Sequence, residues 1–485
     1  MVVIDPRRTD TAEDAELFLG LKPGTDTALF SGLLVHLADH GALDADYIAH
    51  YTSGFDEALA RARQIAGSVA ATALATGLSE ADVVAFFQLF RETERVVTLY
   101  SQGVNQSAQG TDKVNAILNC HLATGRIGKV GASPFSLTGQ PNAMGGREVG
   151  GLANQLAAHM GFTPPDIDRV RRFWEAPRIA THEGLKAVQM FEAIARGEIK
   201  ALWVMGTNPA VSLPDADAVR AALAKLELFV VSENVRSNDT VNAGAQVLLP
   251  AQAWGEKSGT VTNSERRMSR QRAFLVPPGE TRPDWWIVSE VARRLGFASA
   301  FDFASEADVF REHAALSAFE NGGGRDFDIG ALQMVSNEAF DAMPPVQWPL
   351  RQSEAQPQQR FFADGRFFTG DRKARLVAAE IPALRTGTST ERPLRLNTGR
   401  IRDQWHTMTR SGISPRLGQH RAEPFVEVHP EDASRFGVVD GGFARIATDY
   451  GQCVLKVVVS ERQQRGMLFA PIHWSGETAS AARVG

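Results

Sequence analysis

The stretch that decides the fold is ALWVMGTNPAVSLPDADAVRAAL, residues 201–223, followed shortly by LFVVSEN, residues 228–234. The first stretch begins as an apolar strand, passes through a Gly-Thr-Asn-Pro loop, and ends as a helix with apolar side chains at helical spacing. The second is another apolar strand, which ends on the acid Glu233. This alternation predicts an α/β fold with parallel sheets, whose ligands lie beyond the carboxyl ends of the strands.

The N-terminal region loosely echoes this pattern. VVID at residues 2–5 is typical of an apolar strand, and LKPGTDTALFSGLLVHLADHG at residues 21–41 of a turn followed by a capped helix. After further helical segments, VVTLYSQG at residues 96–103 predicts a strand that runs into a glycine-containing loop. We therefore expect a second Rossmann-like region here.

The C-terminal third changes character. FFADGRFF, residues 361–368, predicts a hairpin with an Asp-Gly turn inside an otherwise polar linker. Beyond the linker, residues 425–460 alternate short strands with a one-turn helix and a tight turn, which predicts a β-barrel. In chain order we expect a partial Rossmann-like domain (1–95), a mixed α/β domain (96–350), a linker with a hairpin (351–392) and an incomplete β-barrel (393–485).

The composition excludes several classes of function. The net charge is −5 with acids and bases interspersed, so no basic tract is available to a nucleic-acid polymer. The longest apolar runs, such as residues 83–90, fall far short of the roughly 18 residues that a membrane span needs. The pair Arg7-Arg8 lacks the hydrophobic stretch of a twin-arginine export signal. We expect a cytoplasmic protein with neither a nucleic-acid partner nor a membrane.

Cys120 and Cys453 are the only cysteines. They exclude a disulfide framework, and they are too few to ligate a [4Fe-4S] cluster within this chain. Cys120 falls in a helical stretch and Cys453 in a strand-like one, so we expect two buried structural thiols.

Acids beside strand ends suggest nucleotide sites. Guanine offers two adjacent N–H donors, which a fixed carboxylate such as Asp26 or Glu233 could accept while helix amides bind a pyrophosphate. Taken alone, the two residues are better explained as an ordinary helix N-cap and a solvated acid at a strand end.

Longer motifs carry a family resemblance. They are YSQGVNQSAQGTDKVNAILNCHLATGRIGKVGASPFSLTGQPNAMGGREVGG (100–151), DPRRTDTAEDAELFLGLKPGTD (5–26), WGEKSGTVTNSERR (254–267) and LNTGRIRDQWHTMTRSG (396–412). Together they resemble the molybdopterin oxidoreductase family over essentially the whole chain. The part TGQPNAMGGREVGG, residues 138–151, is similar to the nitrate reductase branch, especially its assimilatory type.

The resemblance implies a site for two molybdopterin guanine dinucleotides that jointly bind one molybdenum, with a C-terminal barrel of the double-psi kind. Contacts to the first guanosine and its phosphates fall on Asp5, Arg7, Thr9, Gly24, Thr25 and Asp26. The loop nearest the metal carries Gln102 and Gln106. Contacts to the second dinucleotide fall on Asn208, Ser232, Glu233, Lys257 and Asp284. A barrel loop over the pterins carries Thr398, Gly399, Arg400, Trp405, His406 and Thr407. No residue of this chain is expected to ligate the metal.

Each of these assignments has a plainer alternative. Lys257 offers a point charge to a phosphate, although most lysines are solvated surface groups. His406 is explained equally well as a cofactor contact and as a structural histidine. We interpret Trp405 as packing rather than as a ligand contact.

Arg147 is the candidate substrate residue. A planar guanidinium matches a planar trigonal oxyanion and stays charged at any working pH. In nitrate reductases, an arginine placed like this one lines the substrate funnel, as the resemblance implies. The alternative is a structural ion pair with Glu148 or another acid.

The implied reaction is oxygen-atom transfer from nitrate, which releases nitrite and consumes two electrons. A ferredoxin, a flavodoxin or an NADH-linked protein would supply them. The resemblance places a [4Fe-4S] segment and a molybdenum-ligating cysteine upstream of this region, and a further pterin-contacting stretch downstream. We therefore expect a fragment that is inactive as a reductase on its own.

Three alternatives stay open from the sequence. A formate dehydrogenase or another oxyanion reductase would share the same family motifs. A non-catalytic scaffold would keep the fold without metal. A nicotinamide-dependent dehydrogenase is disfavoured because no G-x-G-x-x-G follows any expected strand.

Overall fold

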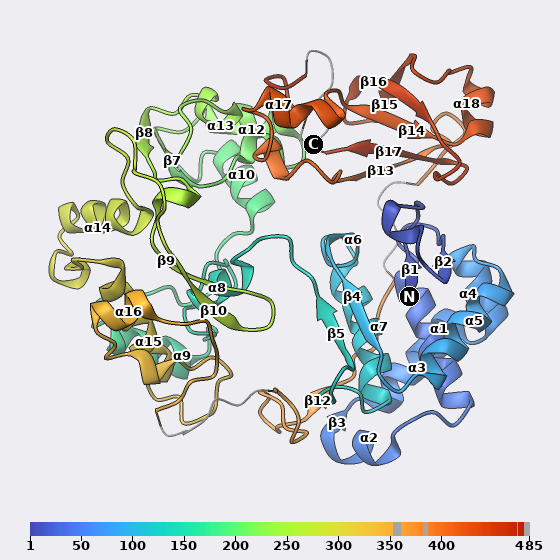
Figure 1. Cartoon of the computed structure of the whole chain (residues 1–485), viewed down its shortest axis with the longest axis horizontal. Helices are drawn as coiled ribbons and strands as arrows, with labels where there is room; N and C mark the ends of the chain where they lie inside the picture. Colours follow the sequence, from blue (N-terminus) through green and yellow to red (C-terminus); the bar gives the residue numbers. More distant parts are fainter. Residues whose placement is uncertain (353–359, 382–386, 473, 480–485) are drawn as a thin grey trace.

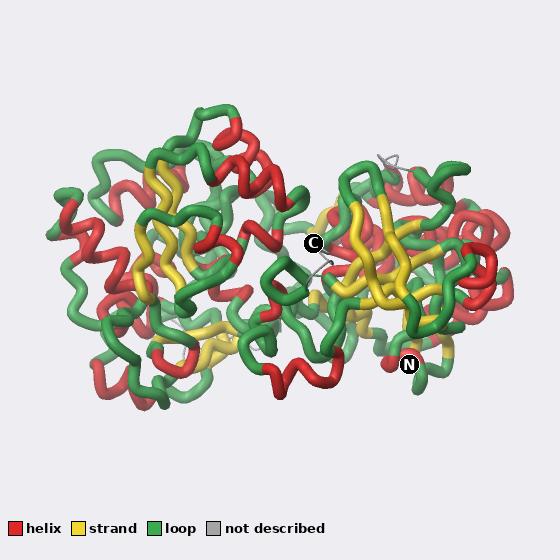
Figure 2. The backbone as a smooth tube through the Cα atoms, turned by 90° about the horizontal axis from the view of Figure 1, so that it is seen from above, coloured by secondary structure: helices red, strands yellow, loops and turns green. Residues whose placement is uncertain are grey.

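The computed structural model describes residues 1–352, 360–381, 387–472 and 474–479. Within these ranges the buried apolar side chains form four hydrophobic cores, and the corresponding parts follow one another around the molecule (Figure 1). The N-terminal part, in blue, lies beside the C-terminal part, in red. Seen from above, the strands of the middle part and of the C-terminal part lie in opposite halves (Figure 2).

The N-terminal part is mainly helical, with short pairs of parallel strands. β1 pairs with β2 and β4 pairs with β5, both in parallel. The strand and the helix expected at residues 2–5 and 21–41 are confirmed as β1 and α1, but the expected side-chain cap is absent, because the Thr25 hydroxyl donates to the carbonyl oxygen of Lys22 instead. The elements of this part are β1 (Val2–Ile4), β2 (Leu17–Leu19), α1 (Asp26–Asp39), α2 (Ala45–Tyr51), β3 (Thr52–Ser53), α3 (Phe55–Ala66), α4 (Val69–Thr76), α5 (Glu80–Glu92), β4 (Val97–Tyr100), α6 (Gln102–Asn105), α7 (Gly110–Ala123) and β5 (Ser133–Ser136).

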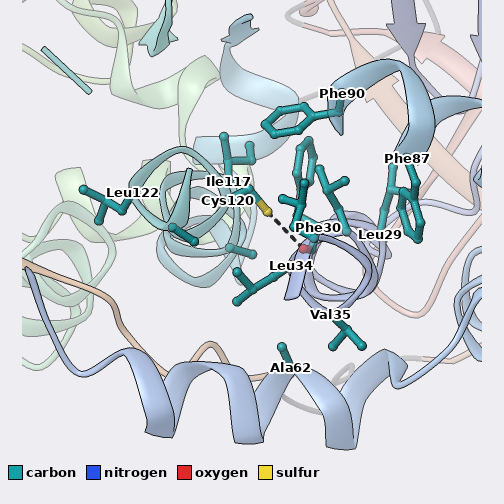
Figure 3. Packing of buried hydrophobic residues seen from close by; sticks show 14 of the residues in the cluster. Leu29, Phe30, Leu34, Val35, Ala62, Phe87, Phe90, Ile117, Cys120 and Leu122 are labelled. Atoms are coloured by element: carbon teal, nitrogen blue, oxygen red, sulfur yellow. Dashed lines mark hydrogen bonds between the residues drawn. The ribbon is translucent and has the colours of Figure 1, made fainter. Parts of the chain in front are cut away.

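Cys120 lies on α7 inside this core, and its sulfur points toward Phe30 of α1 (Figure 3). Its thiol is fully buried and donates to the carbonyl oxygen of Phe30 at 3.2 Å. Burial raises the pKa of the thiol, so it stays protonated and structural. The same core contains α7 and residues 374–379, so the expected domain boundary after residue 95 divides one core rather than separating two.

The middle part confirms the α/β prediction made from residues 201–234. Its three strands are parallel in the order β6-β7-β8, with Ala201 opposite Leu228 and Val230 opposite Val247. Helices pack against this sheet and bury Phe191, Leu223 and their neighbours. Its elements are α10 (Ala187–Ala195), β6 (Ala201–Met205), α11 (Pro209–Ser212), α12 (Ala216–Leu223), β7 (Leu228–Glu233), α13 (Asp239–Asn242) and β8 (Val247–Pro250).

A third core surrounds Trp348 and Phe327, beside an antiparallel sheet in the order β11-β10-β9. It brings residues near 160 together with residues near 340, so residues 96–350 contribute to several cores rather than to one domain. The elements of this region are α8 (Ala143–Glu148), α9 (Pro164–Phe173), β9 (Gly259–Thr262), β10 (Arg267–Gln271), α14 (Asp284–Arg294), α15 (Glu306–Ala318), α16 (Asn337–Ala342) and β11 (Val346–Gln347).

The hairpin expected at residues 361–368 is wrong. These residues form turns, and Phe362 stacks on Phe367 with ring centres 4.4 Å apart. The reason is that the phenylalanines pack on two different cores: Phe361 on the core around Trp348, and Phe362 on the N-terminal core. The following strand, β12 (Ala374–Arg375), pairs in parallel with β3. The rest of the expected linker includes residues 353–359 and 382–386, which lie outside the described residues.

The C-terminal part is a five-stranded mixed sheet in the order β13-β17-β14-β16-β15. The expected turn joins β15 to β16, and the expected short helix follows His429 as α18. Closure of this sheet into a double-psi barrel stays a prediction. The elements are β13 (Arg395–Gly399), α17 (Pro415–Gly418), β14 (Phe425–Val428), α18 (Pro430–Phe436), β15 (Phe443–Ala447), β16 (Gln452–Val459) and β17 (Met467–Pro471).

Side chains of the C-terminal part bind the N-terminal part directly. The amide nitrogen Nε2 of Gln464 donates to the carbonyl oxygens of Pro6 at 2.6 Å, Gly20 at 2.9 Å and Leu21 at 3.2 Å. These contacts explain why the two parts lie side by side in Figure 1.

No single helix in the described ranges has both the length and the apolar character of a membrane span. Helices α4 and α5 meet that test only as a pair, and they are bent by 115° relative to each other. Both helices contribute to the N-terminal core.

Candidate functional site

A pocket of about 710 Å³ lies where the middle sheet meets the C-terminal part. The carboxyl ends of β6 and β7 contribute one wall, as expected for a parallel sheet. Residues far apart in sequence therefore meet at one place. The predicted site residues that line this pocket are Asn208, Ser232, Glu233, Lys257, Asp284 and Thr407.

Two of these side chains are used to build the wall. The Asn208 side-chain oxygen accepts from the backbone nitrogen of Thr240 at 3.1 Å and from its hydroxyl at 2.6 Å. The Ser232 hydroxyl accepts from the indole nitrogen of Trp203 at 2.8 Å. Since both are buried and partnered, they hold the ends of β6 and β7 in place.

Five charged residues line the pocket, namely Glu233, Asp239, Lys257, Asp284 and Glu477, and Lys257 is the one cation among them. Lys257 forms an ion pair with Asp284 at 2.6 Å. Glu233 accepts from the backbone nitrogen of Asn234 at 2.8 Å and from the side chain of Asn238 at 3.2 Å. Burial raises the pKa of Glu233, and these hydrogen bonds and the charge of Lys257 oppose that effect. The set can accept N–H donors on its carboxylates and bind an anion on its lysine.

The opposite wall comes from the C-terminal part and was largely missed by sequence reasoning. It includes Met408 and Ile413, together with Ser475 and Glu477. The Ser475 hydroxyl donates to Asp239 of the middle part at 2.8 Å, which ties the two walls together. The polar run after Trp474 is the only local signal that could have indicated this wall.

Thr407 and Met408, in the same wall, have unusual backbone geometry. Their φ angles are +54° and +60°, in the left-handed region that residues with a Cβ rarely adopt. Two such residues in succession store strain, and strain of this kind is characteristic of ligand-binding segments.

The residues predicted for the first dinucleotide lie where the N-terminal part meets the C-terminal sheet. Asp5 accepts from the backbone nitrogen of Arg7 at 2.8 Å, and burial raises the pKa of its carboxyl. Arg7 donates to Glu427 at 2.9 Å and lies over the ring of Phe469 at 4.0 Å. Thr9 precedes a short 3-10 helix without capping it through its side chain.

Gly24, Thr25 and Asp26 form the turn that begins α1. Gly24 has a φ of +83°, and the Thr25 hydroxyl donates to the carbonyl oxygen of Lys22 at 2.6 Å. Asp26 forms an ion pair with buried Lys113 at 2.8 Å. The charge of Asp26 adds to the effect of burial in raising the pKa of Asp5.

The predicted pterin loops of the N-terminal and C-terminal parts also meet. The Gln102 side chain lies 3.4 Å from His406 Nε2, although the residues are 304 positions apart. Burial lowers the pKa of His406, and the charge of nearby Arg400 lowers it further. Gln106, at the end of α6, is exposed.

Trp405 contacts two arginines of its own segment and the loop that carries Gly139. The guanidinium of Arg400 lies over its ring at 4.3 Å, and that of Arg410 at 5.3 Å. A Cβ added to Gly139 would lie 2.0 Å from the ring atom Cη2, so the indole packs directly against that glycine. Thr398 and Gly399 lie in β13, opposite Ala470 and Pro471 of β17.

Arg147 lies on the exposed side of α8. Burial raises the pKa of Tyr100 at the end of β4, and the charge of Arg147 acts against that effect. Among the described residues Arg147 forms no ion pair, and Glu148 turns inward to Trp348 and Thr262 instead. The alternative of an Arg147–Glu148 ion pair is therefore wrong.

Comparisons with known proteins agree with this architecture. The molybdopterin oxidoreductase family matches residues 1–294, and the "Molydopterin dinucleotide binding domain" matches residues 394–484. The chain belongs to the molybdopterin oxidoreductase family, a family of enzymes.

Among curated relatives, a nitrate reductase of Klebsiella oxytoca is 51% identical over 100% of this chain and 54% of its own length. A nitrate reductase of Shewanella frigidimarina is 44% identical over 98% of this chain and 53% of its own length. The chain thus spans about half the length of these relatives. The acetylene hydratase of Pelobacter acetylenicus shares the fold, with a TM-score of 0.71 at 17% identity, covering 98% of this chain and 66% of that one.

Proposed function

We propose that this chain is the cofactor-binding body of a molybdenum enzyme that reduces nitrate to nitrite. The pocket between the middle sheet and the C-terminal part carries this proposal, because residues assigned to a guanine dinucleotide converge there from distant positions. The relatives named nitrate reductase support the choice of substrate. Relatives named formate dehydrogenase are more distant, at 30% identity or less.

The pocket fits a nucleotide in size and in chemistry. Its volume of about 710 Å³ falls within the roughly 300–1,000 Å³ of typical small-molecule sites. Lys257 supplies a positive charge for a phosphate, and Glu233 or Asp284 supplies the acceptor pair for a guanine edge. Gln102 and His406, which would hold the pterins, come from distant segments and lie 3.4 Å apart.

When bound, bis-molybdopterin guanine dinucleotide supplies the redox chemistry that removes one oxygen from nitrate. The chain's own contribution is to orient the substrate. Arg147 offers two parallel N–H donors to a planar oxyanion. Trp405 packs on Gly139 and keeps the loop before α8 in place.

Electrons must come from a protein outside this chain. We propose a ferredoxin, a flavodoxin or an NADH-linked donor, in a cytoplasmic enzyme of nitrate assimilation. Cys120 is buried in a helical core and Cys453 lies in β16, so neither is placed to bind a cluster. We therefore assign the [4Fe-4S] cluster and the molybdenum-ligating cysteine, which the family resemblance implies, to polypeptide beyond these residues.

The test is a reduced-viologen assay on protein matured in a host that makes the molybdenum cofactor, either as this chain or with the remaining polypeptide co-expressed. We expect bound molybdenum, guanine nucleotide released by acid, and nitrate-dependent viologen oxidation when the remaining polypeptide is present. Activity with formate but not with nitrate would show that the enzyme oxidises formate, which would contradict the proposed nitrate reduction. Absence of both molybdenum and guanine would favour a scaffold.

A further inference from the structure

Helix α8, which carries Arg147, is bound at both ends by one residue of a distant strand. That residue is Thr262, the last residue of β9. Its backbone nitrogen donates to the side-chain oxygen of Asn142 at 2.8 Å, just before the helix begins. Its hydroxyl donates to the carboxylate of Glu148 at 3.1 Å, at the helix end.

Glu148 is almost entirely buried, with 3% of its surface exposed. Its second carboxylate oxygen accepts from the indole nitrogen of Trp348 at 2.7 Å, and its backbone oxygen accepts from Ala158 at 2.7 Å. Burial raises the pKa of this carboxyl, while its hydrogen bonds lower it. A buried carboxyl is costly unless it is fully hydrogen-bonded, so Thr262 and Trp348 are both needed to keep it inside.

The two neighbours Arg147 and Glu148 therefore point in opposite directions from α8. Glu148 faces the core around Trp348, whereas Arg147 faces outward and its charge reaches Tyr100 on β4. Gln155 donates to the backbone oxygen of Arg147 at 2.6 Å, which adds a contact on the outer side. Any rotation that releases Glu148 also moves the guanidinium.

Gly145 shows how closely the start of α8 is packed. A Cβ added there would lie 2.1 Å from the Asn142 oxygen that accepts from Thr262. A side chain at position 145 would therefore displace the Asn142 side chain that accepts from Thr262.

We propose that Thr262 and Glu148 are positioning residues, which fix the Arg147 guanidinium at the substrate site by clamping both ends of α8 to β9. This inference rests on the proposed role of Arg147 in binding nitrate. The two residues do not touch the substrate themselves. They set the geometry in which the guanidinium meets a trigonal oxyanion.

The first experiment reads the position of α8 without requiring catalysis. Trypsin cleaves after arginine, so the peptide that begins at Glu148 reports local opening of α8 by mass spectrometry. Thr262→Val removes the hydroxyl but keeps the backbone bond to Asn142. We expect cleavage after Arg147 about 10-fold faster than in the parent, because an unpartnered buried acceptor destabilises the closed state.

Thr52→Val is the matched control, since Thr52 is similarly buried and its hydroxyl donates to Ile48 at 2.7 Å, far from α8. It should leave cleavage after Arg147 unchanged. Glu148→Gln should behave like the parent, because an amide can still accept from Trp348 and donate to Thr262. Glu148→Leu should resemble Thr262→Val or exceed it. Equal cleavage in Thr262→Val and Thr52→Val would overturn the clamp.

The second experiment uses the molybdenum-loaded enzyme with nitrate. Thr262→Val should raise KM about 10-fold with little change in kcat, and it should add nothing further in an Arg147→Gln background. Additive effects on KM would overturn the proposal. If Arg147→Gln leaves KM unchanged, the substrate role of Arg147 fails. If Arg147→Gln raises KM and Thr262→Val does not, the clamp alone fails.

Discussion

At the scale of single residues, Lys257 pairs with the acid Asp284 and also lines the pocket, where its ammonium can bind a phosphate. Its ion pair with Asp284 spans 2.6 Å at the edge of the pocket. A bound phosphate would share the ammonium with Asp284, because a lysine has three donors. Without the lysine, the carboxylate would repel the same phosphate.

We therefore predict that Lys257→Ala reduces the guanine nucleotide retained by the purified protein. A charge-assisted hydrogen bond contributes about 1.5–3 kcal/mol, so affinity should fall by about 10-fold or more. The measurement is nucleotide released by acid, per mole of protein. Lys200→Ala is the control, since Lys200 forms an exposed ion pair with Glu227 at 2.7 Å and lies outside the pocket lining. Equal losses in both variants would refute a phosphate role.

His121 gives the molecule a predictable response to pH. It is fully buried beside Thr98, whose hydroxyl lies 2.8 Å from Nε2, and burial lowers its pKa to about 3. The unfolded chain therefore binds a proton near pH 6.5 that the folded chain does not. The contribution of His121 to the free energy of unfolding is greatest above about pH 6.5. It falls as the pH decreases toward about 3.

In His121→Gln this contribution is absent. Between about pH 8 and pH 5, the free energy of unfolding should fall by about 2 kcal/mol less in the variant than in the parent. Urea unfolding at both pH values measures this difference. Parallel pH profiles for the two proteins would show that His121 is protonated in the folded state.

At the scale of elements, the contact between Gly139 and Trp405 joins the loop before α8 to the segment after β13. Gly139→Ala should displace the indole and loosen residues 401–410, at a cost of about 1–3 kcal/mol for overpacking. Hydrogen–deuterium exchange should accelerate in that segment. Gly370→Ala is the control, because nothing lies within 4 Å of a Cβ there. Unchanged exchange in Gly139→Ala would mean that the loops adapt freely.

The elements that sequence reasoning predicted well are those encoded locally. Strands β6 and β7 and helix α12 follow from apolar spacing and from a Pro-containing loop within residues 201–234. The turns at residues 361–368 were missed because an Asp-Gly pair favours a hairpin, while the neighbouring rings pack on separate cores. Local spacing contains no information about which core a phenylalanine joins.

At the scale of the whole molecule, the site depends on contacts between distant parts. The residues assigned by resemblance to the second dinucleotide share one pocket, but its opposite wall around Ser475 and Glu477 was not predicted. The hydrogen bond between Thr262 and Asn142, which are 120 positions apart, could not be predicted from the sequence either. Patterns of a few residues indicate which segments carry chemistry, and only the fold determines which segments meet.

Gln464 provides a test of how the N-terminal and C-terminal parts are joined. Gln464→Leu leaves the carbonyl oxygens of Pro6, Gly20 and Leu21 without this donor. We expect the free energy of unfolding to fall by about 1–3 kcal/mol, and hydrogen–deuterium exchange to accelerate at residues 5–21. Gln64→Leu, at an exposed position on α3, should change neither quantity. If Gln464→Leu changes neither quantity, the neighbouring ion pairs are sufficient to hold the two parts together.

The pairing of Arg7 with Glu427 has a consequence for synthesis, because the two residues are 420 positions apart. A ribosome adding roughly 5–20 residues per second delivers the acid about 20–80 s after the arginine. Throughout that interval the first strand has emerged while the sheet that will cover it does not yet exist. Chaperones that recognise nascent polypeptides therefore have this whole interval in which to bind the first strand, until Glu427 and the strands around it have been synthesised.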